Sequence, residues 1–222
     1  MENVDYVNNP NQRTPCVLVL DASGSMYGNR IEELNAGMVE FERQLKDDPS
    51  ALTRVQLAII CVGGPRSEAS ILMDWTDCAN FTAFPLVTGG NTPLGEGLLL
   101  GLDLIESGKQ NLRSAGISYT RPWMFVISDG EPTTAPETWQ IATQKCKDAE
   151  AQNKLEIFSI AVAGANTATL SSFSKRPAMP LQGTNFRELF VWLTGTLKSV
   201  SNTRPGDTVA LPSTDPWRFV GV

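Results

Sequence analysis

The chain has 222 residues, 41% of them hydrophobic, and carries a formal net charge of −6 with an isoelectric point near 4.8. This acidic balance argues against nucleic acid or an anionic membrane as the main partner, because both select a basic face. The absence of histidine excludes Ser-His-Asp and Cys-His hydrolases and His-ligated metal sites.

For the first quarter of the chain, the sequence predicts a flexible N-terminal segment, a buried strand and a helix. Residues 1–13 are polar, lack the apolar core of a secretory signal and are expected to be flexible. The apolar run Cys16–Leu20 predicts a strand buried on both faces. Apolar residues then recur at helical spacing from Ile31 to Lys46, which predicts an amphipathic helix that Asp47–Ser50 ends.

A hairpin and a long helix are predicted next. Val55–Val62 predicts a second buried strand. Ser70–Trp75 follows too closely for a crossover helix, so these two strands are expected to be antiparallel neighbours. The loop Gly89–Gly95 opens a helix whose Gly97 and Gly101 allow close approach to the sheet, and a polar connection is expected from Gly108 to Arg121.

The second half alternates strands with helices. Trp123–Ser128 and Leu155–Val162 predict buried strands on either side of a helix over Glu137–Gln152. The remaining expected elements are a helical turn at Thr167–Ser172, an edge strand near Pro177–Leu181, a helix from the N-cap Asn185 to about Val200 with Glu188 at capping-box spacing, and a Pro-rich tail over 201–222.

This pattern predicts one doubly wound α/β domain over residues 14–200, with helices on both faces of a mostly parallel sheet. No apolar run reaches membrane-spanning length. Cys16, Cys61, Cys78 and Cys146 have no CxxC spacing, and we expect reduced thiols buried as small hydrophobes. A cytoplasmic location is therefore expected.

Oxygen-bearing side chains follow two of the buried strands and open one helix. Asp21, Ser23 and Ser25 follow the first strand, Thr92 precedes a helix, and Asp129 follows the strand at Trp123–Ser128. Ligands of doubly wound sheets bind at the carboxyl ends of strands, which predicts that these loops meet. The set contains only hard oxygens, which suit Mg²⁺, Mn²⁺ or Ca²⁺.

The motif Asp21-Ala-Ser-Gly-Ser25, Thr92 in Gly-Gly-Asn-Thr-Pro and Asp129 in Ser-Asp-Gly together resemble the metal-ion-dependent adhesion site (MIDAS) of von Willebrand factor type A (VWA) domains. This resemblance implies direct ligation by Ser23, Ser25 and Thr92, with Asp21 and Asp129 acting partly through water. It also implies a mostly parallel six-stranded sheet with one antiparallel edge strand.

A narrower resemblance rests on the short chain and on the residues in and around these three motifs. The chain is similar to bacterial stand-alone VWA proteins of the TerY-like type, found in tellurite-resistance clusters. That resemblance implies a non-enzymatic, cytoplasmic stress-response adaptor acting beside a protein kinase and a PP2C-type phosphatase. The metal would capture an acidic side chain of the partner protein.

Two other functions are open at this point. A Mg²⁺-dependent phosphohydrolase would use Asp21 as nucleophile, but such enzymes need a second Asp two residues later, where this chain has Ser23. A structural subunit would hold the metal without presenting it to a partner. Taken singly, Asp21, Thr92 and Asp129 also fit plain turns or helix caps, and Glu131 and Thr133 are expected to be exposed loop residues.

Overall fold

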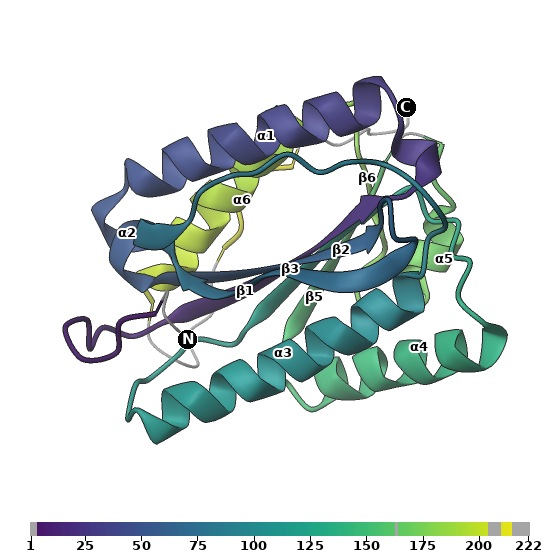
Figure 1. Cartoon of the computed structure of the whole chain (residues 1–222). Coiled ribbons are helices and arrows are strands. Elements are labelled where there is room, and N and C mark those ends of the chain that lie inside the picture. Colours follow the sequence, from purple (N-terminus) through teal and green to yellow (C-terminus); the bar gives the residue numbers. More distant parts are fainter. Residues whose placement is uncertain (1–3, 163, 204–209, 215–222) are drawn as a thin grey trace.

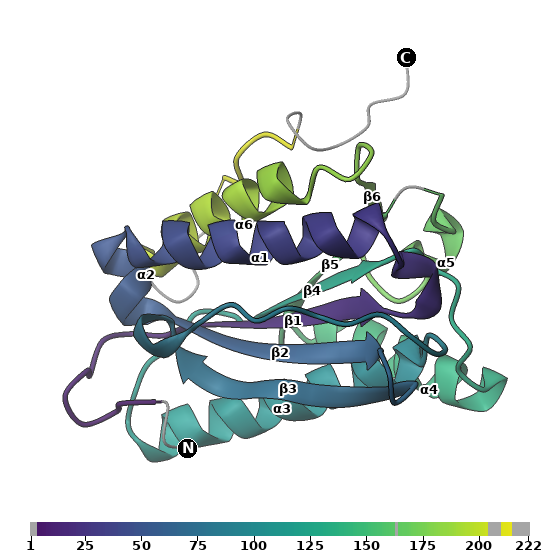
Figure 2. The same ribbon diagram turned by 45° about the horizontal axis from the view of Figure 1, so that its top comes forward.

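A computed structural model describes residues 4–162, 164–203 and 210–214. A six-stranded sheet lies between two layers of helices (Figures 1 and 2). The strands are β1 (Thr14–Ala22), β2 (Val55–Gly63), β3 (Glu68–Asp77), β4 (Trp123–Ser128), β5 (Glu156–Ala161) and β6 (Met179–Pro180). The helices are α1 (Asn29–Lys46), α2 (Pro49–Arg54), α3 (Leu94–Ser114), α4 (Pro136–Ala151), α5 (Thr167–Ser171) and α6 (Phe186–Ser201), with 3-10 turns η1 (Gly24–Met26) and η2 (Cys78–Asn80).

The strand order is β3-β2-β1-β4-β5-β6. All neighbouring strands are parallel except β2 and β3, which confirms the expected antiparallel hairpin at one edge. The chain builds outward from β1 in one direction and then from β4 in the other. The carboxyl ends of β1 and β4 are therefore neighbours at the point where the strand order reverses, which is where doubly wound sheets bind ligands.

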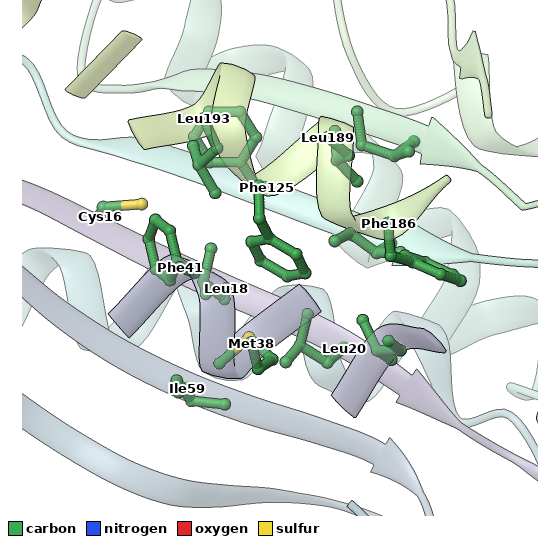
Figure 3. Close-up of a cluster of buried hydrophobic side chains, with 14 of the residues drawn as sticks. Cys16, Leu18, Leu20, Met38, Phe41, Ile59, Phe125, Phe186, Leu189 and Leu193 are labelled. Atoms are coloured by element: carbon green, nitrogen blue, oxygen red, sulfur yellow. The ribbon is translucent and has the colours of Figure 1, made fainter. Parts of the chain in front are cut away.

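Alternating residues of the central strands pack into two separate cores. Leu18 and Phe125 face the layer of α1 and α6, as Figure 3 shows, whereas Val17 and Met124 face α3 and α4. Every residue of β1 is buried, and its middle part, Cys16–Leu20, is a continuous apolar run and not an alternating pattern, as expected for a strand covered on both faces.

Helix α3 is longer than expected. It continues through Gly108 to Ser114, so the predicted polar connection from Gly108 is wrong over its first seven residues. A side chain at Gly108 would place its Cβ only 2.6 Å from the indole nitrogen of Trp75, which donates to the carbonyl of Leu104. Gly108 thus permits close helix–strand packing and does not end the helix. Gly97 and Gly101 likewise face Val62 and Met124, as expected.

Two helix termini also differ from expectation. Asp48 and Pro49 end α1 as predicted but immediately begin α2, where the Asp48 side chain caps the amide of Ala51 at 2.7 Å. Asn185 is the N-cap residue of α6, as predicted, but its side chain makes no capping hydrogen bond, so the predicted capping box is not formed.

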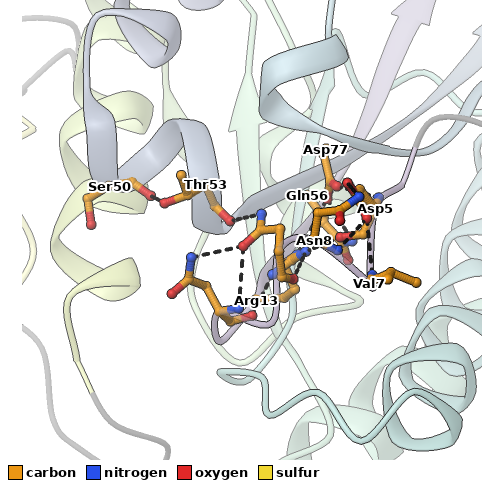
Figure 4. Close-up of polar contacts among 10 residues, drawn as sticks. Asp5, Val7, Asn8, Arg13, Ser50, Thr53, Gln56 and Asp77 are labelled. Carbon is orange, nitrogen blue, oxygen red and sulfur yellow. Dashed lines mark hydrogen bonds and ion pairs between the residues drawn. The ribbon is translucent and has the colours of Figure 1, made fainter.

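The segment before β1 makes several polar contacts with the rest of the domain (Figure 4). Arg13 is completely buried and donates to the carbonyls of Asp5, Asn9 and Asn11. Asp77, at the end of β3, accepts from the amide of Asp5 at 2.8 Å. The predicted flexible segment over residues 1–13 thus has defined polar contacts from Asp5 onward, and its flexibility stays a prediction; residues 1–3 lie outside the described part.

Residues 210–214 run back over α6, where the Trp192 indole donates to the carbonyl of Pro212 at 2.9 Å. The tail aromatics Trp217 and Phe219 lie outside the described residues. All four cysteines are buried and unpaired, as expected, and burial raises the pKa of the Cys78 and Cys146 thiols to about 12. Within the described part of the chain, no helix has the length and apolar character needed to cross a membrane.

Candidate metal site

The first carboxylate of the candidate site is fixed at the end of β1. Asp21 is 1% exposed, and its two oxygens accept from the Ser23 amide at 2.8 Å and from the Ser128 hydroxyl at 2.6 Å. Burial raises the pKa of the Asp21 carboxyl, the negative charge of Asp129 raises it further, and the hydrogen bonds from Ser128 and Ser23 oppose this shift. Because Ser128 bonds Asp21 and directly precedes Asp129 in the chain, the two aspartates lie on adjoining segments.

The two serines of the first loop lie together beside Asp21. Their hydroxyl oxygens are 3.0 Å apart, with Ser23 buried and Ser25 exposed. The short turn η1 produces this arrangement, since Met26 and Tyr27 donate to the carbonyls of Ser23 and Gly24. One hydroxyl of this pair, that of Ser23, is therefore on a buried residue, and the other, that of Ser25, is on an exposed residue.

The second carboxylate, Asp129, lies at the end of β4. Its side chain is almost fully buried, and its Oδ1 atom has no hydrogen-bond partner among the described residues. Its Oδ2 atom lies 3.7 Å from Nη1 of Arg30 on α1. A buried carboxylate oxygen without a donor is costly, so this atom needs a ligand or a water molecule.

The site is built from three segments, which follow β1, precede α3 and follow β4, and are called here the first, second and third loops. Each pair of these loops is joined by at least one hydrogen bond. The Ser128 hydroxyl links β4 to Asp21, and the Gly24 amide donates to the carbonyl of Gly90 at 3.1 Å. Thr92 and Thr133 exchange two bonds, from the Thr92 amide to the Thr133 hydroxyl at 3.0 Å and from the Thr133 amide to the Thr92 carbonyl at 2.9 Å. All five predicted ligands therefore lie at or just beyond the ends of strands, or just before a helix, where these segments meet at one rim of the sheet.

Thr92 is buried and is not the cap of the helix that follows, because the N-cap position of α3 is occupied by Pro93. Helix capping, the alternative role expected for the Thr92 side chain, is therefore not observed. Glu131 and Thr133 are exposed, as expected, although Thr133 also supports the backbone of Thr92.

The donor set fits a hard dication. Both carboxylates are buried, and Oδ1 of Asp129 has no hydrogen-bond partner among the described residues. A cation would compensate the two negative charges and give that oxygen a partner. Within residues 4–162, 164–203 and 210–214, no group of three or more His, Cys, Asp or Glu side chains is arranged to hold a metal. A metal here would depend on hydroxyls and two carboxylates, a set typical of Mg²⁺ and not of zinc.

Gly63, the last residue of β2, lies between the first two loops. Its φ is +89°, and an added Cβ would lie 2.7 Å from the Asn91 carbonyl oxygen and 2.8 Å from Cα of Ser23. These neighbours are backbone atoms of the two loops, so they cannot yield as a flexible side chain would.

Gly63→Ala is therefore expected to destabilise the domain by about 2–4 kcal/mol and to weaken metal binding in the fraction that remains folded. Urea unfolding followed by Mg²⁺ titration would measure both effects. Gly116→Ala is the control, since Gly116 also has a positive φ but nothing lies within 4 Å of an added Cβ. Equal loss of stability in both variants would mean that backbone strain alone, without the loop contact, explains the effect.

Sequence reasoning missed four residues around the site: Ser128, Thr133, Arg30 and Gly63. Ser128 and Thr133 lie within four residues of Asp129 in the same motif, so their position alone signalled a supporting role. Arg30 and Gly63 gave no such signal, because their contacts with Asp129 and Ser23 depend on how distant elements pack.

The family model of the von Willebrand factor type A domain matches residues 16–190. The solved pilus adhesin SpaC from Lactobacillus rhamnosus GG is similar with a TM-score of 0.69 at 14% identity, over 85% of this chain and 30% of SpaC. The chain thus corresponds to less than a third of that protein. A search of curated proteins found no match.

Two isolated domains are similar over nearly their whole length. The von Willebrand factor domain of the type V pili tip protein Mfa5 from Porphyromonas gingivalis has a TM-score of 0.60 at 13% identity, covering 89% of this chain and 99% of that domain. The SpRpn10 VWA domain has a TM-score of 0.52 at 12% identity, covering 80% and 93%. At these identities the similarity establishes the fold alone. By the family match over most of its length, the chain belongs to the von Willebrand factor type A domain family.

Proposed function

We propose that this domain binds a hard divalent cation, Mg²⁺ in the first instance and Mn²⁺ or Ca²⁺ as alternatives, and uses it to capture an acidic side chain of a partner protein. The proposed ligands are Asp21, Ser23, Ser25, Thr92 and Asp129. The observation that carries the proposal is the buried Oδ1 of Asp129, which has no hydrogen-bond partner in the part of the chain that the structure describes, near a second buried carboxylate.

The charge of the site favours an anionic ligand. Two aspartates only balance a dication, and the hydroxyls of the other proposed ligands are neutral. The bound metal would therefore remain electrophilic, with room for a further oxygen ligand, because Mg²⁺ prefers six ligands. The exposed side chain of Ser25 marks the open side from which a partner carboxylate would approach.

The family context agrees with a binding role, since VWA domains commonly mediate protein–protein interactions. The resemblance to TerY-like proteins extends the proposal to a cytoplasmic role in tellurite resistance or stress signalling. There the partners would be a protein kinase and a PP2C-type phosphatase. This extension is supported by the residues of the three motifs.

Hydrolysis of phosphate esters is less well supported than binding. The position two residues after Asp21 holds Ser23, whose hydroxyl lies 3.0 Å from that of Ser25 and which has no acidic proton to deliver at neutral pH. A purely structural metal is disfavoured by the exposure of Ser25, because a closed structural site leaves no ligand position open to solvent.

The proposal is tested with two peptide libraries that differ only at one fixed position, Glu in one and Gln in the other. The domain is expected to enrich peptides from the Glu library in Mg²⁺, to enrich none from the Gln library, and to lose binding in EDTA. Asp21→Ala should bind neither library. Specific peptides that bind equally well in EDTA would overturn the proposal.

A further inference from the structure

Arg30 brings a positive charge to two of the proposed ligands. It is the second residue of α1, and its Nη1 atom donates to the backbone carbonyl of Ser25 at 3.0 Å and lies 3.7 Å from Oδ2 of Asp129. On the other side, its Nη2 atom lies 3.6 Å from the position that a Cβ on Gly164 would occupy. The guanidinium is thus placed between the metal site and the loop after β5.

This position has an electrostatic consequence for a metal. A guanidinium is always charged and partly compensates the negative charge of Asp129, which reduces the repulsion between Asp129 and Asp21. The same charge repels a dication bound by Asp129. The Arg30 side chain is 33% exposed and Asp129 only 6%, so solvent screens this interaction only in part.

We propose that Arg30 is an internal counter-cation of the site, which competes with the divalent metal for Asp129 and sets the metal affinity of the domain. This inference rests on the proposed function, because it presupposes that a metal binds at Asp129. It goes beyond it by assigning a residue outside the ligand set that determines how readily the metal is taken up. It also gives the loaded site one positive charge in excess, which adds to its preference for an anionic partner.

The test is calorimetric titration of Mg²⁺ alone into the full chain. Arg30→Gln is expected to bind Mg²⁺ about three- to tenfold more tightly than the wild type, the range expected when one partly screened charge is removed. Arg30→Lys keeps the charge and is expected to stay within about twofold of the wild type.

Arg187→Gln is the matched control. Arg187 is 3.8 Å from Glu40, an ion pair of nearly the same length. Glu40 lies ten residues after Arg30 on α1, about 15 Å away along the helix and beyond the screening length at physiological salt. This variant should leave Mg²⁺ affinity unchanged.

A second readout needs no metal. In EDTA, Arg30→Gln is expected to melt at a lower temperature than Arg30→Lys, because Asp129 loses its compensating charge, and saturating Mg²⁺ should remove this difference. Equal or weaker Mg²⁺ binding by Arg30→Gln would overturn the role of Arg30 while the metal site stands. Absence of Mg²⁺ binding in every variant would overturn the proposed function itself.

Discussion

Asp21→Asn and Asp129→Asn are each expected to weaken Mg²⁺ binding by roughly a hundredfold or more while the chain stays folded. Each change removes one of the two charges that balance the dication but preserves side-chain shape. The amide oxygen introduced at position 21 can still accept from the Ser23 backbone N–H, and loss of charge repulsion offsets part of any lost hydrogen bonding. Folding is therefore expected to persist in both variants.

Thermal unfolding with and without Mg²⁺ measures this directly. A ligand at a hundred times its Kd stabilises the native state by about 2.7 kcal/mol, and a hundredfold loss of affinity should reduce this increment to about 0.4 kcal/mol in both variants. Asp148→Asn, an exposed aspartate on α4, is the charge-matched control and should keep the increment. Unchanged Mg²⁺ stabilisation in both site variants would contradict the assignment, and unfolding of both would indicate a structural role for these carboxylates.

Arg13→Met is expected to lower the free energy of unfolding by about 3–5 kcal/mol, as is usual when one partner of a buried ion pair is removed. The Arg13 Nε atom lies 3.4 Å from the nearly buried carboxylate of Asp77, an ion pair without hydrogen-bond geometry. Methionine would leave that charge uncompensated and the carbonyls of Asp5, Asn9 and Asn11 without their donor.

Urea unfolding would show this loss as a lower midpoint with an unchanged slope. Arg187→Met, at an exposed position, should change the free energy of unfolding by no more than about 0.5 kcal/mol. Arg13→Lys should be intermediate, because lysine keeps the charge but not the planar fork that reaches several carbonyls. A loss below about 1 kcal/mol for Arg13→Met would contradict the view that this arginine anchors the segment before β1.

Local patterns were sufficient for most of the fold. The apolar runs of β1, β2, β4 and β5 and the helical spacing of α1 are properties of short segments, and each element forms where the pattern predicts it. The antiparallel β2–β3 pair followed from a connection too short for a crossover. Helix α3 was predicted too short because Gly108 resembles a local break, whereas its packing against Trp75 is a long-range contact.

In the candidate site, too, some residues could be predicted from local sequence and others could not. The five proposed ligands could be named because each lies at a strand end or helix start within a recognisable motif. The sequence does not show that Ser128 bonds Asp21, that Gly63 separates two loop backbones, or that Arg30 lies against Asp129. The burial of Arg13 was missed for a similar reason, since its partners in Asp5 and Asp77 are brought together only by the folded sheet edge.

If three distant loops jointly hold one hard dication, anomalous diffraction from crystals of this chain grown with Mn²⁺ will locate it. We expect one anomalous peak between Asp21 and Asp129, with the hydroxyl oxygens of Ser23 and Ser25 at bonding distance, about 2.0–2.3 Å. A map with no peak there at saturating Mn²⁺, or with the only ordered Mn²⁺ elsewhere on the molecule, would contradict this expectation.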